Sequence, residues 1–176
     1  PRHSSSAASD VYKRQALSGS DVCVANSEAT KRDFISRYSP PTDWDCEVIH
    51  WGVDTEMFTP AETRDKDLRR RFGCSEEDIL LLAVGRLAAR KGYGSLLRAF
   101  ALVNSEFSNS KLVIVGRGHL RKRLLNQAHS LGISSSVYIE SSMSFEELAK
   151  LFRNADLTVY PSYYEGQGLI PLESMS

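Results

Sequence analysis

The sequence is poor in the features that mark several protein classes. It has three cysteines in 176 residues, Cys23, Cys46 and Cys74, and no two of them are spaced as CxxC. An odd number of cysteines without metal-ligand spacing indicates free thiols in a reducing compartment, rather than a disulfide framework or a zinc site. The longest uninterrupted apolar run, Ile79–Val84, is far shorter than the roughly 20 residues that a membrane-spanning helix needs.

An excess of charge of one sign is absent as well, since 22 Lys and Arg balance 22 Asp and Glu. The bulk charge therefore gives no reason to expect nucleic acid or an anionic membrane as a partner. The four histidines lack metal-ligand spacing, and no G-x-S-x-G elbow is present, so neither a metal centre nor a serine nucleophile is expected. The hydrophobic fraction of 41% and the charged fraction of 25% are near globular averages, which excludes wholesale disorder.

The two ends of the sequence are unusual. The chain begins with Pro1, and its first twenty or so residues are rich in serine without the apolar core of about 7–15 residues that a signal peptide needs. We interpret residues 1–15 as a non-native tail that resembles translated vector sequence, with a native tail as the alternative. Ser176 falls a few residues into an expected helix. Both ends predict that the chain is a fragment.

The sequence before residue 79 predicts one short βα unit and a linker. Short β-rich runs at 22–25 and 47–50 flank a segment that favours a helix over 28–38. Residues 53–67 are polar and have no sustained apolar period, so we interpret them as a linker. Apolar residues four positions apart, followed by a glycine, predict a short helix at about 68–72.

Strands and helices alternate regularly after residue 79. The apolar runs ILLLAV and KLVIVG are typical of strands covered on both faces, and VYIE and DLTVYPS predict two more strands. Amphipathic helices separate them, with Val103 and Phe145 expected on buried faces and a capping box formed by Ser144 and Glu147. The alternation predicts an α/β fold with a parallel, doubly wound sheet. Ligands of such sheets bind at the carboxyl ends of the strands.

The loop after the first of these strands is basic. Gly85 lets the backbone turn sharply at the strand end, and Arg86 and Lys91 flank the loop. Arginine offers a planar fork to a phosphate and lysine a point charge, so the two side chains can converge on one anion. The alternative interpretation is a pair of solvated loop cations.

The loop after the second strand imitates a dinucleotide-binding fingerprint. It contains Gly116 and Gly118, and Glu140 ends the next strand where a ribose-binding acid would lie. Arg121 stands where the third glycine is needed for close packing of helix on strand. We therefore interpret the loop mainly as a tight turn, and the basic residues around Arg121 as a solvated helix face.

The loop after Tyr160 carries the strongest candidate site. Glu165 and Glu173 bracket a glycine-containing turn and the start of a helix, which Pro171 favours. Backbone N–H groups at a helix start bind anions, and carboxylate oxygens accept hydrogen bonds from hydroxyl groups. Taken singly, each acid is also explained as a loop or helix-start residue. The candidate residues of this loop are Glu165, Gly166, Gln167, Gly168, Leu169 and Glu173.

These segments resemble the group 1 retaining glycosyltransferases of the GT-B fold. The match rests on "VGRLAARKG" at 84–92 followed by "EGQGLIPLE" at 165–173, which has the family signature of a Glu, seven residues and a second Glu. "VIHWGVDTEMFTP" at 48–60 resembles the family's passage from its first domain into its second, and "VANSEATKRDF" at 24–34 the end of the first domain. The resemblance covers residues 22–176.

The resemblance implies two Rossmann-like domains that face each other across a cleft, with a nucleotide-sugar donor bound mainly by the second. It assigns the donor phosphates to Arg86 and Lys91, the donor sugar to Glu165, and the ribose hydroxyls to Glu173, with backbone N–H groups offered by Gly166 to Leu169. Arg86, Lys91 and Glu165 are the expected catalytic residues. No metal or other cofactor is implied, because the cations and the helix dipole would stabilise the leaving diphosphate.

On the same resemblance, residues 16–54 are the end of the acceptor-binding domain, 55–78 an interdomain linker with a short helix, and 79–176 a truncated donor-binding domain. The implied partners are a nucleoside-diphosphate sugar and a glycan, lipid or other hydroxyl acceptor, with no nucleic acid. The implied location is the cytoplasm, with peripheral membrane contact through the missing domain as a further option. The implied role lies in cell-envelope or polysaccharide synthesis.

The predicted function is therefore transfer of a hexose from a nucleotide sugar to a hydroxyl acceptor with retention of configuration. This chain would carry the donor-binding half and would be inactive alone. Two alternatives stay open: an NAD-type oxidoreductase that uses Gly116, Gly118 and Glu140, and a non-catalytic relative that binds a nucleotide sugar.

Overall fold

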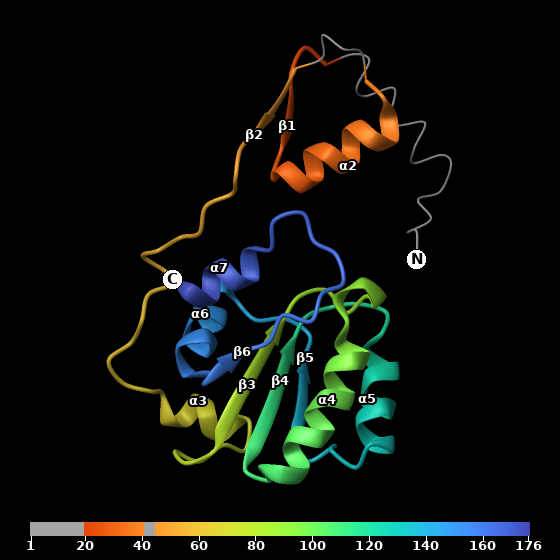
Figure 1. The fold of residues 1–176 in the computed structure, drawn as a ribbon. Helices are drawn as coiled ribbons and strands as arrows, with labels where there is room; N and C mark the ends of the chain where they lie inside the picture. The colour runs from red at the N-terminus through yellow and green to blue at the C-terminus, as the bar shows by residue number, and fades with distance from the viewer. Residues whose placement is uncertain (1–19, 41–44) are drawn as a thin grey trace. The chain divides into compact units, whose positions relative to one another are not determined.

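The computed structural model describes residues 20–40 and 45–176, and the predicted tail at 1–15 lies outside them. The chain divides into two compact units that meet between Gly52 and Val53. Figure 1 shows the course of the chain through both units.

The first unit is a βαβ element. Its two strands, β1 (Cys23–Ala25) and β2 (Cys46–Val48), pair in parallel with Cys23 opposite Cys46. The helix between them, α2 (Glu28–Tyr38), has the predicted bounds. Ser27 caps its start by accepting a hydrogen bond from the Thr30 N–H at 3.0 Å. The second strand begins at Cys46, one residue earlier than predicted, and ends at Val48 instead of at residue 50.

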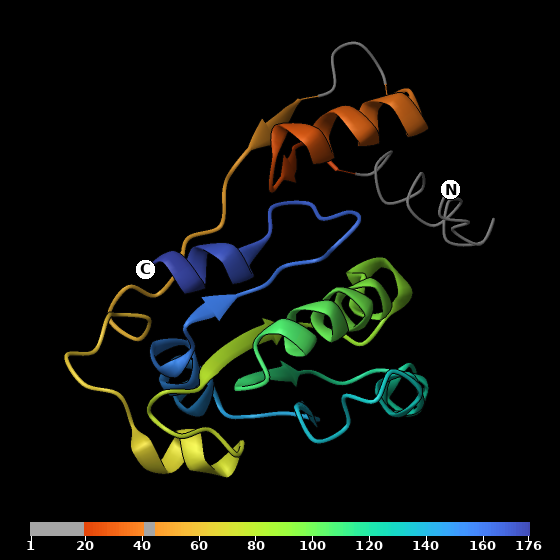
Figure 2. The same cartoon turned by 60° about the horizontal axis from the view of Figure 1, so that its bottom comes forward.

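The second unit is a four-stranded parallel sheet in the order β5-β4-β3-β6. Helices lie between successive strands, as Figures 1 and 2 show. The central strands β3 and β4 pair over their whole length, whereas β6 pairs with β3 through only two residues. The elements are α3 (Lys66–Arg71), β3 (Ile79–Val84), the 3-10 turn η1 (Ala89–Lys91), α4 (Tyr93–Glu106), β4 (Ser110–Val115), α5 (Arg121–Ser130), β5 (Val137–Glu140), α6 (Phe145–Asn154), β6 (Leu157–Thr158) and α7 (Leu169–Met175).

Alternate residues of β3 belong to two separate hydrophobic cores. Leu81 and Ala83 pack with α4 and α5 on one face. Leu80 and Leu82 pack with residues of α3 and α6 on the other. A strand whose successive side chains are all buried needs cover on both faces. The predicted parallel, doubly wound α/β sheet is therefore confirmed.

Three further details of the sequence prediction are wrong. The fourth strand extends only over Leu157–Thr158, not over the whole DLTVYPS segment. Val103, in the last turn of α4, is 39% exposed, because the covered face of that helix ends at Phe100. Phe145 is 68% exposed because it opens α6, and the covered face of α6 begins one turn later at Ala149.

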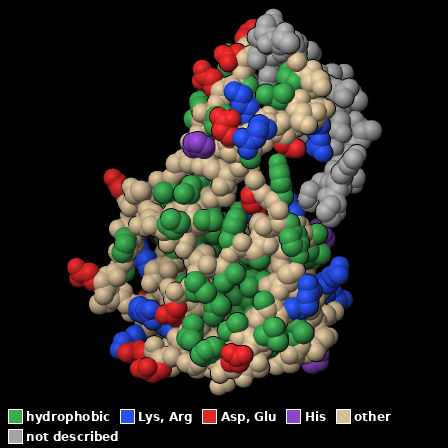
Figure 3. Space-filling model, viewed as in Figure 1, with side chains coloured by type: hydrophobic (Ala, Val, Ile, Leu, Met, Phe, Trp, Pro, Cys, Tyr) green, Lys and Arg blue, Asp and Glu red, His purple; other side chains and the backbone are tan. Residues whose placement is uncertain are grey.

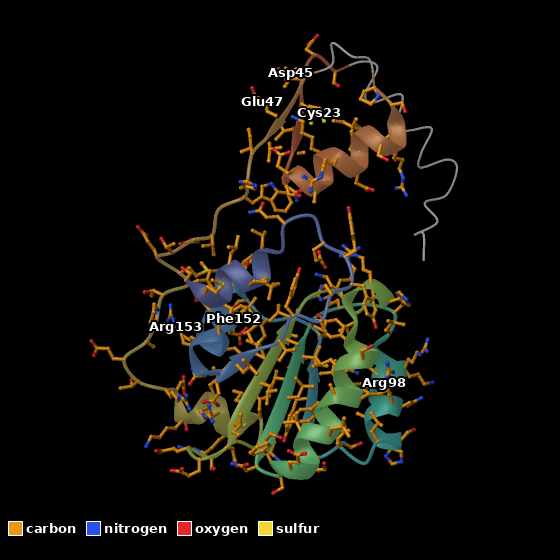
Figure 4. All side chains as sticks on the ribbon, viewed as in Figure 1. Cys23, Asp45, Glu47, Arg98, Phe152 and Arg153 are labelled. Atoms are coloured by element: carbon orange, nitrogen blue, oxygen red, sulfur yellow. The ribbon has the colours of Figure 1, made fainter. Side chains whose placement is uncertain are left out.

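The segment after Gly52 packs against α6 through hydrogen bonds and an aromatic contact. Arg153 donates hydrogen bonds to the carbonyls of Thr59, at 2.8 Å, and Met57, at 2.5 Å. Phe58 is buried and packs edge-on against Phe152 with ring centroids 5.7 Å apart. Figure 4 labels Phe152 and Arg153 on this helix. Residues of the predicted linker therefore pack within the second unit.

A buried arginine joins the elements around β3 and β6. The guanidinium of Arg69, in α3, donates to the carbonyl of Asn154 at 2.7 Å and to the carboxylate of Asp156 at 3.2 Å. It also donates to the carbonyls of Ser75 and Asp78. A buried charge is tolerated only when its hydrogen-bonding capacity is met. Arg69 therefore ties α3, the end of α6 and the approach to β3 together.

Replacing Arg69 by Met should leave these carbonyls and the Asp156 carboxylate short of donors. We expect the free energy of unfolding to fall by about 3 kcal/mol or more, as for other buried pairs that lose one partner. Urea unfolding followed by circular dichroism measures the change. Arg70→Met, which removes an exposed side chain paired with Asp67, is the matched control and should stay within about 0.5 kcal/mol of the parent. Equal effects of the two substitutions would contradict the role of Arg69.

Candidate functional site

The loops that follow β3 and β6 meet at the carboxyl end of the sheet. Gly92 has φ of +70°, and a Cβ atom there would lie 2.1 Å from the carbonyl oxygen of Pro161. The N–H of Tyr163 donates to the carbonyl of Arg90 at 2.9 Å. Only glycine permits so close an approach in this backbone conformation. The structure thus brings together the two loops that the sequence singled out.

An ion cluster lies where these loops meet. The ammonium of Lys91 lies 2.6 Å from Oε1 of Glu165, and Nη1 of Arg90 lies 2.7 Å from the same oxygen. Lys91 is 8% exposed, and its Nζ lies 5.2 Å from the ring centroid of Tyr160. The carboxylate and the ring face are the favourable contacts of this enclosed ammonium group.

The cluster fixes the charge of Glu165. Burial by itself raises the pKa of this carboxyl, but hydrogen bonds from Lys91 and Arg90 outweigh burial and hold the pKa below its usual value. Glu165 is therefore an anion at neutral pH. The same negative charge, together with burial as the larger cause, raises the pKa of the neighbouring Tyr160 hydroxyl.

The remaining predicted residues of the basic loop lie beside this cluster. Gly85 has φ of +140°, and a Cβ atom there would lie 3.4 Å from Cε and Nζ of Lys91. The side chain of Arg86 is exposed. Lys91 and Arg86 therefore differ in state: the lysine is buried in an ion pair, and the arginine extends into solvent.

The predicted glycine turn leads into α7. Gly168 has φ of +76° and is the N-cap of the helix, which has no side-chain cap. Leu169 is its first residue. Gly166 and Gln167 lie in the preceding turn and are half-buried. These positions leave the first N–H groups of the helix without a capping side chain.

Glu173 lies further along α7, apart from the ion cluster. It lines a pocket of about 270 Å³ together with Phe58, Phe152 and Arg153. Its Oε2 is buried and has no hydrogen-bond partner among the described residues. Burial raises the pKa of this carboxyl. A buried carboxylate oxygen without a protein donor is unusual, and ionising it there is costly.

Backbone atoms of the neighbouring loop occupy the space beside Gly116 and Gly118. A Cβ atom at Gly116 would lie 1.9 Å from the carbonyl oxygen of Gly85, and one at Gly118 would lie 2.3 Å from that of Leu87. Glu140, the acid that a dinucleotide would need, instead lies 3.4 Å from Arg71. The two glycines are therefore required because the neighbouring loop packs closely against them. This packing explains the fingerprint without a bound dinucleotide.

Sequence reasoning missed Arg90 as a member of the site. Its side chain lies between Arg86 and Lys91 in a loop rich in cations, where the sequence pattern does not single it out. Only the path of the chain shows that it contacts the loop at 163–165. The sequence signal that it does carry is adjacency to Lys91 in the same 3-10 turn, η1.

The described residues contain neither a metal-binding cluster nor a membrane-spanning helix. Within residues 20–40 and 45–176, no group of three or more His, Cys, Asp or Glu is placed to hold a metal ion. In the same part of the chain, no helix has the length and apolar character needed to cross a bilayer. All three cysteines are free thiols.

Comparison with known sequences identifies the family. A profile for glycosyl transferases group 1 matches residues 64–176, more than half of the chain. The chain therefore belongs to the group 1 glycosyltransferase family. The profile covers both loops of the ion cluster and the whole parallel sheet of the second unit.

Individual relatives agree with this assignment. The chain is 31% identical to the uncharacterized glycosyltransferase MJ1607 of Methanocaldococcus jannaschii over 94% of its own length and 43% of that protein. It is 35% identical to a D-inositol 3-phosphate glycosyltransferase of Thermobispora bispora over 93% of its length and 40% of the relative. The chain thus spans about two fifths of the curated relatives that it matches.

Solved structures share the fold. Anabaena Alr3699/HepE, in complex with UDP and glucose, superposes with a TM-score of 0.82 at 21% identity, over 97% of this chain and 46% of that one. At this identity the likeness shows the fold alone. The predicted GT-B type of α/β fold is confirmed.

Glu173 generates a prediction about stability. The Glu173→Gln variant should be more stable than the parent by about 1 kcal/mol at neutral pH, because a buried ionised oxygen without a partner is costly. A raised folded-state pKa means that the penalty is complete above that pKa and absent below the unfolded value of about 4.3. The gain should therefore disappear as the pH falls to about 4.

Urea unfolding of Glu173→Gln at pH 7 and pH 4 measures this difference. Glu62→Gln, at an exposed position before α3, is the control and should show no such gain. A stabilisation of Glu173→Gln that is as large at pH 4 as at pH 7 would show that the carboxylate charge is not its cause.

Proposed function

We propose that this chain is the donor-binding part of a retaining glycosyltransferase that transfers a hexose from a nucleoside-diphosphate sugar. The observation that carries the proposal is the meeting of a basic loop with the Glu165 loop at the carboxyl end of a parallel sheet. Ligands of doubly wound sheets bind at that edge. The family assignment supports the class of reaction.

The cations of the first loop would take the diphosphate. Arg86 is exposed in the loop after the strand, and Lys91 lies a few residues further along the same loop, paired with Glu165. Charge develops on the diphosphate as the sugar leaves, so cations fixed at that point lower the barrier. We propose on this ground that transfer needs no metal ion, with activity in excess chelator as its check.

The two acids would take hydroxyl groups. Glu165 is an anion and can accept hydrogen bonds from the donor sugar. The unpartnered Oε2 of Glu173 is suited to a hydroxyl donor, and we assign it to the ribose. Backbone N–H groups from Gly166 to Leu169 would meet the sugar and the phosphate.

The acceptor is proposed only as a class. Relatives are named as a D-inositol 3-phosphate glycosyltransferase and a phosphatidylinositol monomannoside mannosyltransferase, which supports a hydroxyl on a polar headgroup, glycan or lipid. The whole protein would act in the cytoplasm, with or without contact to a membrane surface. The partly exposed cluster of Glu165 is the point at which the donor sugar would face that acceptor.

Titration with nucleotide sugars tests the donor class. The chain is titrated calorimetrically with UDP-, GDP- and ADP-sugars and, as a control, with NAD(H). We expect saturable binding of at least one nucleotide sugar and none of NAD(H). Binding of NAD(H) alone would overturn the proposal.

Removing either phosphate-binding cation should impair transfer. In the full-length enzyme, Arg86→Ala and Lys91→Ala should each lower kcat/KM about 100-fold or more, since charge on the leaving diphosphate would be unmatched. Arg123→Ala, which removes an exposed cation of α5, is the control and should change kcat/KM little. Unchanged kcat/KM in both loop variants would refute the assigned role.

The chain by itself should bind the donor without transferring the sugar. It spans about two fifths of its relatives, and we assign acceptor binding mainly to the remainder. Radiolabelled donor incubated with the purified chain and a panel of hydroxyl acceptors checks this. Sustained turnover would contradict the division of roles.

A further inference from the structure

We propose that Arg90 is a positioning residue that retains Glu165 while Lys91 exchanges its carboxylate partner for the diphosphate of the donor. The inference rests on the proposed function and deepens it. It assigns a task to a residue outside the predicted site and links the two loops energetically.

Arg90 is bound to the second loop at three points. Its carbonyl accepts a hydrogen bond from the N–H of Tyr163 at 2.9 Å. Its guanidinium donates to the carbonyl of Tyr164 at 3.2 Å and to Oε1 of Glu165 at 2.7 Å. An arginine held by both backbone and side chain has a fixed fork geometry. Arg90 is therefore a fixed counter-ion of Glu165.

Lys91 is bound differently. Among the described residues, its ammonium has one carboxylate partner, the same Oε1 that Arg90 contacts, and beyond it the ring of Tyr160. A lysine head is a point charge on a flexible stem and can turn to a new anion without loss of geometry. When the donor diphosphate arrives, Lys91 is the cation free to change partners.

Competition between the two anions follows from this arrangement. The ion pair of Lys91 with Glu165 opposes phosphate binding, because the ammonium must weaken one contact to make the other. Arg90 reduces that opposition, since Glu165 keeps a cation at hydrogen-bonding distance after Lys91 turns away. Without Arg90, Glu165 would depend on Lys91 alone and would hold it more tightly.

Two substitutions should therefore shift diphosphate affinity in opposite directions. Glu165→Gln frees Lys91, so affinity for a nucleoside diphosphate without a sugar should rise about threefold or more, because exposed ion pairs set only the lower limit for a pair as enclosed as this one. Arg90→Gln should lower that affinity by a similar factor. Arg90→Lys keeps a positive charge but loses the planar guanidinium, so its diphosphate affinity should lie between those of Arg90→Gln and the parent.

The double variant distinguishes this linkage from a direct attraction of Arg90 for phosphate. If Arg90 acts through Glu165, Arg90→Gln should have no effect in the Glu165→Gln background, and the double variant should bind as tightly as Glu165→Gln alone. If Arg90 contacts the phosphate directly, the loss should persist in that background, and the proposal would be overturned.

The experiment is isothermal titration of the whole chain with UDP, GDP and ADP, carried out on the diphosphate that the parent binds best. Arg70→Gln removes an exposed guanidinium with a carboxylate partner on α3 and is the matched control, with unchanged affinity expected. Thermal unfolding of every variant verifies the fold, and Arg90→Lys replaces Arg90→Gln if the latter does not fold.

The outcomes separate the two proposals. If the parent binds none of the three diphosphates, the proposed function and this inference both fail. If the parent binds a diphosphate, and both Arg90→Gln and Arg90→Lys bind it as tightly as the parent does, only the inference fails. The inference is supported if Glu165→Gln raises the diphosphate affinity, Arg90→Gln lowers it, and the double variant binds as tightly as Glu165→Gln alone.

Discussion

The carboxylate of Asp156 holds the short strand β6 against β3, and the site depends on that contact. The backbone of Asp156 donates to the carbonyl of Leu80, and its side chain accepts from the Leu80 N–H at 2.8 Å. Burial raises the pKa of Asp156, but the hydrogen bonds from Leu80, Arg69 and Arg64 outweigh it and lower the pKa overall. A strand of two paired residues has little ladder of its own, so this carboxylate supplies much of its attachment. The loop that carries Glu165 begins where that strand ends.

The second unit uses buried charge in two ways. Around Asp156, the guanidinium of Arg69 is almost fully enclosed and binds several carbonyls at once, so the pair is a permanent part of the fold. Around Glu165, two cations share one carboxylate oxygen and the cluster is partly open. Figure 3 shows further Lys and Arg side chains gathered along the edge that carries α4 and α5. The balanced net charge of the chain conceals all of these local arrangements.

Much of the fold could be predicted from the sequence because its signals are local. Apolar runs that no polar residue interrupts require cover on both faces. Both hydrogen bonds of the predicted capping box at Ser144 and Glu147 are present. Other features could not be predicted because they depend on distant chain segments. The ends of β6 and the exposure of Phe145 and Val103 are decided by where neighbouring elements stop, which periodicity does not encode.

The candidate site shows the same division. The pairing of the loops after β3 and β6 follows from parallel topology, so Lys91 and Glu165 could be placed near each other in advance. The contacts of Arg90, and the missing partner of Glu173 Oε2, depend on side-chain paths and depth of burial. The GxG turn imitates a nucleotide motif because close approach of backbone to a ligand and close approach of backbone to another loop require the same residue.

That interlocking of loops has a consequence for dynamics. The loop at 85–88 and the segment at 116–120 exchange hydrogen bonds, with Leu87 donating to the carbonyl of Arg117 and Leu120 donating to that of Leu87. Neither loop can swing away without breaking bonds in the other, so the two should open as a single cooperative unit. A ligand that settles on one loop would slow amide hydrogen exchange in both, although the second loop never touches it.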